Sequence, residues 1–140
     1  MAFEAINTLT DEQIQDLHTI YQSEWWTRDR QLLDIRLMLQ RSDAIVAFCD
    51  ADSKRLIAFA RVITDYVYKA LVLDVIVEAS HRKKGLGRNL MDRIIDHPSL
   101  KCVRHFELYC HPEMVPFYQK WGFTEDLGEL RFMRRVHASM

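Results

Sequence analysis

The sequence has few of the residues that cross-link or punctuate small domains: three cysteines, four glycines and three prolines in 140 residues. Cys49, Cys102 and Cys110 are odd in number and show no CxxC spacing, so we expect reduced thiols rather than a disulfide framework. The chain also lacks internal repeats, low-complexity tracts and a Pro/Gly/Ser-rich linker. We therefore expect a single domain over residues 1–140.

The chain also lacks a charge excess and long apolar runs. Its formal net charge is −1 at pH 7, so no global field attracts nucleic acid or an anionic membrane. No apolar stretch reaches membrane-spanning length, and residues 1–10 lack the basic and apolar segments of a secretory signal. We expect a cytoplasmic protein with neither a nucleic-acid nor a membrane partner, and exposed aromatic residues leave a homodimer open.

Apolar residues make up 49% of the chain, which is enough for a substantial core. Thr10 and Gln13 have the spacing of a capping box at the start of a helix. Periodicity predicts helices over 11–23, 28–40, 85–96 and 114–120, and strands over 44–49, 56–63, 69–77, 104–109 and 130–136. The first two strands should form an antiparallel hairpin, and the nearly all-apolar third should be central. This order indicates a mixed α/β domain.

A basic turn with two glycines joins the central strand to the next helix. It reads Val77-Glu78-Ala79-Ser80-His81-Arg82-Lys83-Lys84-Gly85-Leu86-Gly87. Free N–H groups and the helix dipole favour an anion there, and glycine lets the backbone approach a pyrophosphate. The turn is neither Walker A nor the dinucleotide fingerprint, whose third glycine position holds Leu90. The alternative is a solvated basic turn with no ligand.

The pattern Arg82-x-x-Gly85-x-Gly87 after a central strand resembles the acetyl-coenzyme A signature of the Gcn5-related N-acetyltransferase (GNAT) family. Phe117-Tyr118-Gln119-Lys120-Trp121-Gly122-Phe123 resembles a later segment of the same family. Upstream, Trp26-Thr27-Arg28-Asp29-Arg30 and the segment 59–65 resemble an uncharacterised bacterial subgroup. The resemblance thus covers most of the chain.

This resemblance implies a GNAT-like mixed sheet flanked by helices, in which two central parallel strands, 69–77 and 104–110, splay apart around the coenzyme. It implies acetyl-coenzyme A as co-substrate, without a metal, and direct transfer to an amine. The implied coenzyme-binding residues are Val75, Ile76 and Val77 for the pantetheine arm, and Arg82, Lys83, Lys84, Gly85, Leu86, Gly87 and Arg88 for the pyrophosphate.

Two residues are candidates for proton transfer. The family resemblance places Tyr118 near the coenzyme sulfur, where a phenol can donate a proton to the departing thiolate. Asp74 interrupts the apolar central strand, and burial would raise its pKa toward the range of a general base. The alternatives are an aromatic packing cluster around Tyr118 and a structural ion pair for Asp74.

The acceptor pocket is the least defined part of the prediction. Trp25 and Trp26 are candidates for its wall, and Arg61 and Asp65 for recognition of a charged acceptor. Simple packing of the tryptophans and a loop ion pair between Arg61 and Asp65 are the alternatives. Four further residues, Cys102, His105, Cys110 and His111, could in principle hold a metal, and Cys110 beside His111 could act as a thiol nucleophile. The direct transfer that the resemblance implies argues against a thiol intermediate, and Cys110 and His111 would point to opposite faces of a strand.

Three functions remain open at this level. The first is an N-acetyltransferase for a small-molecule amine, with a protein lysine or amino terminus as the alternative acceptor. The second is an acetyl-coenzyme A-binding module without catalysis. The third is a nucleic-acid surface around residues 82–84, for which the near-neutral chain offers too little positive charge.

Overall fold

The computed structural model describes residues 2–137, which fall into two compact units, Met1–Leu108 and Tyr109–Met140. The single domain over residues 1–140 stays a prediction. No helix in the described part of the chain is long and apolar enough to cross a membrane.

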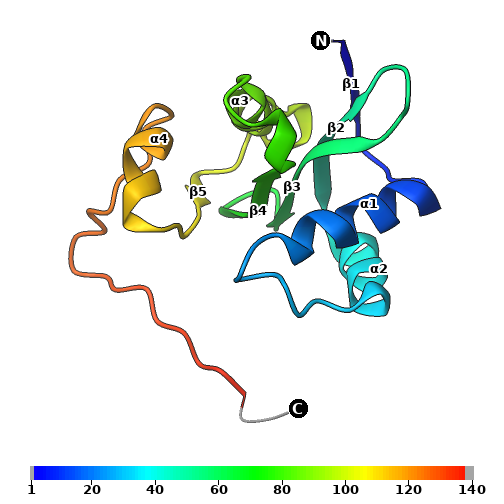
Figure 1. Cartoon of the computed structure of the whole chain (residues 1–140). Coiled ribbons are helices and arrows are strands. Elements are labelled where there is room, and N and C mark those ends of the chain that lie inside the picture. Colours follow the sequence, from blue (N-terminus) through cyan, green and yellow to red (C-terminus); the bar gives the residue numbers. More distant parts are fainter. Residues whose placement is uncertain (1, 138–140) are drawn as a thin grey trace. The chain divides into compact units, whose positions relative to one another are not determined.

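The first unit is built on a five-stranded sheet with the order β1-β2-β3-β4-β5 (Figure 1). Its strands are β1 (Phe3–Ile6), β2 (Ala44–Asp50), β3 (Leu56–Thr64), β4 (Lys69–Val77) and β5 (His105–Glu107). All neighbours pair antiparallel except β4 and β5, which are parallel. The predicted mixed sheet and the β2–β3 hairpin are confirmed. Strand β1 was not predicted, because four residues are too short for a periodic signal.

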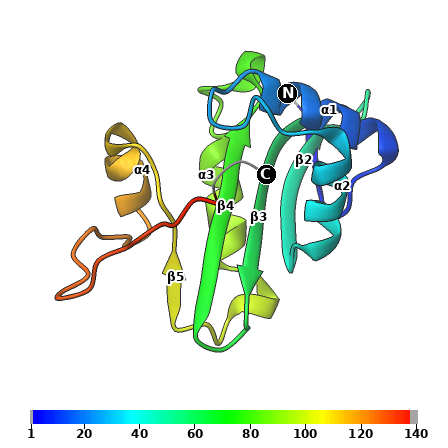
Figure 2. The same ribbon diagram turned by 90° about the horizontal axis from the view of Figure 1, so that it is seen from below.

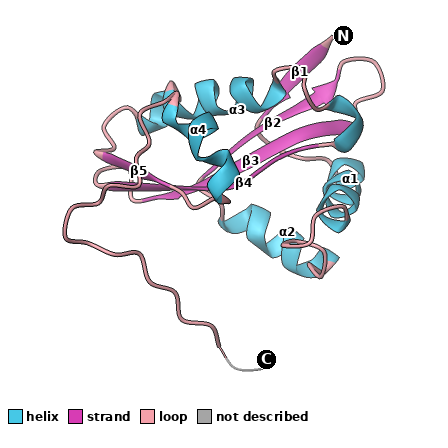
Figure 3. Cartoon of the chain, turned by 60° about the vertical axis from the view of Figure 1, so that its left-hand side comes forward, coloured by secondary structure: helices cyan, strands magenta, loops and turns pink. Residues whose placement is uncertain are grey.

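Three helices cover the sheet: α1 (Asp11–Gln22) and α2 (Leu32–Arg41) on one face, and α3 (Leu86–Ile95) on the other (Figures 2 and 3). The predicted capping box starts α1, since the Thr10 hydroxyl accepts from the Gln13 backbone and the Gln13 side chain accepts from the Thr10 N–H. Helix α2 begins at Leu32 rather than at the predicted residue 28. The preceding residues form turns, in which the buried Thr27 hydroxyl donates to the Tyr21 carbonyl.

The core on the α1/α2 face surrounds Leu17, Tyr21 and Phe59, whose side chains are fully buried. Tyr21 and Phe59 meet edge to face, with ring centroids 6.4 Å apart. Ile35 from α2 and Ile76 from β4 belong to the same cluster. On the opposite face, α3 buries a helical stripe that consists of Leu86, Leu90, Met91 and Ile94.

A β-bulge interrupts β4 at Asp74. Phe59 pairs with Ile76 and Arg61 with Leu73, so the two residues Asp74 and Val75 lie opposite Ala60 alone. Asp74 adopts a positive φ of 56°, which is uncommon for a residue other than glycine. Bulges bend a strand and redirect its side chains, and here the Asp74 carboxylate reaches Tyr21 on α1.

The parallel pair β4–β5 is short. Lys69, Ala70 and Leu71 pair with His105, Phe106 and Glu107, and β4 then continues to Val77 without a strand on that side in the described part of the chain. The expected pair of parallel strands is thus present, and β5 spans His105–Glu107 rather than the predicted 104–110. Backbone N–H and C=O groups without a strand partner on this side of β4 can pair with an extended ligand, and of these the Val77 carbonyl already accepts from Arg82 Nε.

The second unit contains a 3₁₀ turn (Pro112–Met114) and the short helix α4 (Val115–Gln119). The predicted strand over 130–136 is wrong. Among the described residues it has no strand partner, and Leu130, Phe132 and Met133 are 72%, 63% and 87% exposed. Alternation of apolar and polar residues creates a strand only where a neighbour completes its hydrogen bonds.

Candidate functional site

The loop between β4 and α3, residues 82–88, has the geometry of an anion-binding site, and we call it the donor loop. Lys83 and Gly85 have positive φ values of 64° and 82°, and Gly85 is the N-cap of α3. Glycine has no side chain that could cap the helix, so the first N–H groups of α3 are free for a ligand. A Cβ at Gly85 would meet nothing within 4 Å, so the space beside Gly85 is open. Lys83, Lys84 and Arg88 are exposed.

Arg82 is held by protein groups at the start of this loop. Its Nε donates to the Val77 carbonyl at 3.1 Å, and its guanidinium forms an ion pair with Glu24, which follows α1. The side chain predicted to hold pyrophosphate therefore ties the donor loop to the α1–α2 connection. Lys83, Lys84 and Arg88 form no ion pair within residues 2–137 and fit the pyrophosphate role better.

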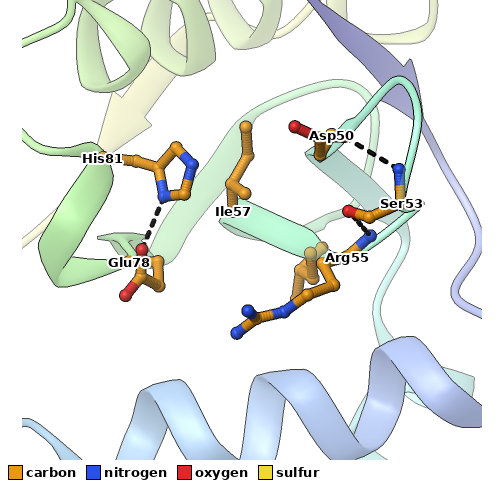
Figure 4. A pocket seen from close by; sticks show the side chains of 7 residues that line it. Asp50, Ser53, Arg55, Ile57, Glu78 and His81 are labelled. Atoms are coloured by element: carbon orange, nitrogen blue, oxygen red, sulfur yellow. Dashed lines mark hydrogen bonds and ion pairs between the residues drawn. The ribbon is translucent and has the colours of Figure 1, made fainter.

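Glu78 fixes the chain just before the donor loop. Its Oε2 accepts from the Ser80 backbone at 3.1 Å and from the Ser80 hydroxyl at 2.5 Å, and it lies 2.5 Å from His81 Nδ1. These hydrogen bonds, that of Ser80 first, lower the pKa of Glu78 to about 2. Figure 4 shows Glu78 and His81 at one side of a shallow pocket of about 140 Å³. None of the predicted site residues lines this pocket.

Asp74 is the centre of a buried ion cluster on the α1/α2 face. Its Oδ2 accepts from the Tyr21 hydroxyl at 2.9 Å, from Arg30 Nη1 at 2.6 Å and from Arg61 Nε at 2.8 Å. Its Oδ1 accepts from Arg30 Nη2 at 3.1 Å, so Arg30 binds both oxygens. The Arg30 guanidinium also stacks on the Tyr21 ring, 4.7 Å from its centroid. We call Tyr21, Arg30, Arg61 and Asp74 the Asp74 cluster.

The expected rise in the pKa of Asp74 is wrong. Burial alone would raise it, but the hydrogen bonds and charges of Arg30 and Arg61 outweigh burial and hold the pKa of Asp74 below its ordinary value. Burial, and then the charge of Asp74, raise the pKa of Tyr21. The cluster thus matches the structural ion-pair alternative for Asp74. A general base at Asp74 stays an untested prediction that these contacts disfavour, because a carboxylate stabilised in this way accepts a proton poorly.

Arg61 and Asp65 do not form the ion pair considered as an alternative, since Arg61 pairs with Asp74. Asp65 instead closes the β3–β4 turn, where its Oδ1 accepts from the N–H groups of Val67, Tyr68 and Lys69. These bonds, that of Val67 first, lower the pKa of Asp65. The turn joins the end of β3 to the start of β4, whereas the donor loop follows the end of β4. Asp65 therefore lies away from the donor loop.

Trp25 and Trp26 lie in the α1–α2 connection and are 67% and 39% exposed. The same connection carries Arg30, which attaches it to β4 through Asp74. Their place beside this anchored segment is compatible with a pocket wall, and their role in acceptor binding stays a prediction.

Tyr118 lies in the second unit and is buried among aromatic rings. Phe117 and Phe123 lie edge-on to it, with ring centroids at 5.0 Å and 6.2 Å. Burial, and then the charge of Cys110, raise the pKa of Tyr118 to about 12. The phenol therefore keeps its proton near neutral pH, as a proton donor must. Burial likewise raises the pKa of Cys110, which disfavours a thiolate nucleophile. Among residues 2–137, no His, Cys, Asp and Glu side chains group to hold a metal ion.

Three residues that matter in this geometry had no role in the sequence analysis: Tyr21, Glu24 and Arg30. Tyr21 was expected only as a helix residue, and Arg30 only as part of a resembling segment. An aspartate in an apolar strand was a signal that buried cations were needed. The sequence could not show that Tyr21 and Arg30, 53 and 44 residues before Asp74, are the partners of this aspartate.

Known proteins resemble this chain in sequence and fold. The model of the Acetyltransferase (GNAT) family matches residues 10–123. GCN5-related N-acetyltransferase 1, chloroplastic, from Arabidopsis thaliana is 31% identical over 86% of this chain and 60% of its own length. Serotonin N-acetyltransferase 2, chloroplastic, from Oryza sativa subsp. japonica is 38% identical over 74% of this chain and 53% of its own length. The chain thus spans little more than half the length of these relatives.

A crystal structure of a GNAT-family protein from Xanthomonas campestris pv. campestris superposes with a TM-score of 0.83 at 29% identity. The match covers 98% of this chain and 94% of that protein. The family match extends over the α1–α2 connection, the bulged β4, the donor loop and the Tyr118 segment. With this sequence match and this fold, the chain belongs to the acetyltransferase (GNAT) family.

Proposed function

We propose that the chain is an N-acetyltransferase that moves the acetyl group of acetyl-coenzyme A directly to a primary amine of a small molecule. One observation carries the proposal. Beyond Leu71 the β4 edge has no strand partner in the described part of the chain, and this edge runs directly into the donor loop. An extended amide-containing arm and a pyrophosphate are the two features of coenzyme A that such an edge and loop fit.

The proposal assigns binding roles to these two elements. Backbone groups of Val75, Ile76 and Val77 hydrogen-bond the pantetheine arm, while Lys83, Lys84, Arg88 and the first N–H groups of α3 hold the pyrophosphate. Acetyl-coenzyme A, when bound, would supply an acetyl group activated as a thioester. Gly85, Leu86 and Gly87 shape the loop, and Arg82 fixes its orientation through Glu24.

Acetyl transfer also requires two proton transfers, one to the departing thiolate and one from the amine. The proposal assigns the Tyr118 hydroxyl to donate a proton to the coenzyme A thiolate that leaves when the amine takes the acetyl group, which the buried, protonated state of Tyr118 permits. The amine must reach the site in its neutral form, and Asp74, stabilised as a carboxylate, is a poor acceptor for its proton. We therefore assign Asp74 to positioning Arg30 and Arg61 and leave proton removal to water.

The cellular location, the subgroup within the family and the oligomeric state of the chain are also predictions. The relatives from Arabidopsis and rice are named as chloroplastic, which does not support a cytoplasmic location or a bacterial subgroup for this chain. The cytoplasmic location, the bacterial subgroup and a homodimer therefore stay predictions. The name of the rice relative makes serotonin one amine to test.

The test combines binding with turnover in the full chain. Calorimetry with coenzyme A comes first, followed by release of its free thiol from acetyl-coenzyme A over arylethylamines, aminoglycosides, polyamines, amino acids and peptides. We expect coenzyme binding and turnover of at least one small amine. Turnover of peptides alone would favour a protein acceptor, and binding without turnover a non-catalytic module. Failure to bind coenzyme A would overturn the proposal.

A further inference from the structure

We propose that the acceptor carries an anionic group, a carboxylate or a phosphate, in addition to its amine, and that Arg61, supported by Arg30, binds this group. The inference rests on the proposed function and names the substrate class of the same site. It is carried by the charge, the geometry and the solvent access of the Asp74 cluster.

The cluster has more positive than negative charge. It contains the guanidinium groups of Arg30 and Arg61 and the carboxylate of Asp74, which gives an excess of one positive charge. The side chain of Asp74 is 3% exposed, and those of Arg30 and Arg61 are 28% and 13% exposed. A cation this poorly hydrated gains more from a second anion than a surface cation does, because water screens the interaction less.

Arg61 has hydrogen-bonding capacity to spare. Its Nε donates to Asp74, whereas its Nη1 and Nη2 atoms donate no hydrogen bond within residues 2–137. Every fully buried side-chain nitrogen or oxygen of the described residues has a hydrogen-bond partner. The two Nη atoms must therefore reach solvent. A guanidinium that one carboxylate holds by Nε still presents its Nη groups to a second anion.

The nearby carboxylates do not supply that second anion. Asp65, considered as an alternative partner of Arg61, accepts with its Oδ1 from three N–H groups of the β3–β4 turn. Glu24, in the same connection as Arg30, pairs with Arg82. Within residues 2–137, Asp74 is the one carboxylate that forms a salt bridge with Arg61.

The position of Arg61 suits an acceptor rather than the coenzyme phosphates. Asp74, which holds Arg61, is adjacent in sequence to Val75, where the proposed pantetheine-binding edge begins. The cluster lies on the α1/α2 face through Tyr21 and Arg30, while the donor loop follows the end of β4. An anionic group on Arg61 would thus hold a small amine beside this edge.

A second role for Arg61 is the alternative to binding an anionic group of the acceptor. Its Nη groups could instead stabilise negative charge that develops on the acetyl carbonyl oxygen during transfer. In that case loss of Arg61 would slow every acceptor alike. Anion recognition instead predicts a loss confined to acceptors with a carboxylate or a phosphate, mainly in KM.

The experiment uses matched product pairs that differ in one anionic group. N-acetyltyrosine is compared with N-acetyltyramine, and N-acetyl-O-phosphoethanolamine with N-acetylethanolamine, by calorimetry on the full chain saturated with coenzyme A. The first pair tests a carboxylate and the second a phosphate. We expect the anionic member of at least one pair to bind about tenfold tighter or more.

Variants then localise the preference. Arg61→Gln should remove it without changing the affinity of the neutral members, and Lys101→Gln, which removes an exposed positive charge of the same unit, should keep it. Asp74 retains Arg30 and Tyr21 in Arg61→Gln, and unchanged coenzyme affinity would verify its fold. If Arg61→Gln does not fold, Arg61→Lys provides the test. This variant keeps the positive charge but loses the paired N–H donors of the guanidinium, so it should weaken the preference for the anionic products.

Equal affinities within both pairs in the unmodified protein would overturn the inference, and so would a preference that survives in folded Arg61→Gln. Because product binding needs no turnover, the two proposals fail separately. Turnover of neutral amines such as serotonin without an anion preference leaves the acetyltransferase and removes the anion site. An Arg61-dependent preference without turnover of any amine leaves the anion site and removes the acetyltransferase.

Discussion

Glu24 and Arg82 form an ion pair that joins the α1–α2 connection to the donor loop across 58 residues of sequence. Glu24 places a negative charge beside a loop that we expect to hold a pyrophosphate. The pair holds the Arg82 side chain and ties the donor loop to the α1–α2 connection.

Glu24→Gln is expected to tighten coenzyme A binding about two- to fivefold, because the variant removes an anion that repels the phosphates, an effect of roughly 0.5–1 kcal/mol at an exposed site. Calorimetry at low salt measures the change. Glu12→Gln removes an exposed charge from the first turn of α1 and serves as control. Equal affinity of the Glu24 variant and the unmodified protein would contradict this role.

Asp74→Asn is expected to destabilise the fold by about 3–5 kcal/mol, because it leaves two poorly hydrated arginines without their shared anion. Urea denaturation at neutral pH measures the free energy of unfolding. Asp52→Asn, in an exposed turn, is the matched control. A loss below about 1 kcal/mol, the range of a surface ion pair, would show that the cluster is not a structural element.

Gly85→Ala is expected to weaken coenzyme A binding about tenfold, because a residue with a Cβ at a φ of 82° costs about 1–2 kcal/mol and the loop must change shape to relieve it. Gly128→Ala is a matched control. It introduces the same group at a φ of 64° in the second unit, also in open space. If both variants bind coenzyme A like the unmodified protein, the donor loop is misassigned.

Tyr118→Phe is expected to lower kcat about 100-fold or more while the Kd for coenzyme A stays the same, because the variant keeps the ring packing and loses the proton. Steady-state kinetics and calorimetry separate the two quantities. Tyr109→Phe, at an exposed tyrosine of the same unit, should leave both unchanged. Normal turnover in the Tyr118 variant would remove this residue from the mechanism.

Glu78→Gln should produce a pH-dependent loss of stability. The pKa of Glu78 is lowered to about 2 in the folded protein, so its contribution is present above the ordinary pKa of a glutamate and disappears as the pH falls toward 2. The difference in Tm between the unmodified protein and the variant should therefore shrink between about pH 5 and pH 2. The exposed Glu129→Gln provides the baseline. A difference that stays constant over this range would exclude the contribution.

Local signals predicted much of the fold. Thr10 and Gln13 satisfy each other within one turn of helix, and the β2–β3 hairpin follows from two apolar runs around a polar turn. The apolar run over Lys69–Val77 predicted β4 with its observed bounds. These features succeed because neighbouring residues determine them. The strand over 130–136 failed because a strand also requires a partner, which its own residues do not specify.

The same division applies to the candidate site. The sequence by itself determined the local pattern of the donor loop, in which a strand is followed by four cations and two glycines at the start of a helix. The coenzyme-binding role of this loop stays a prediction. It also marked Asp74 as an anomaly. Only the tertiary structure decided that Asp74 meets Tyr21, Arg30 and Arg61 and that Arg61 does not meet Asp65. The reason is physical: a buried charge takes its partners from whichever elements pack around it, and packing joins residues 13 to 53 positions apart.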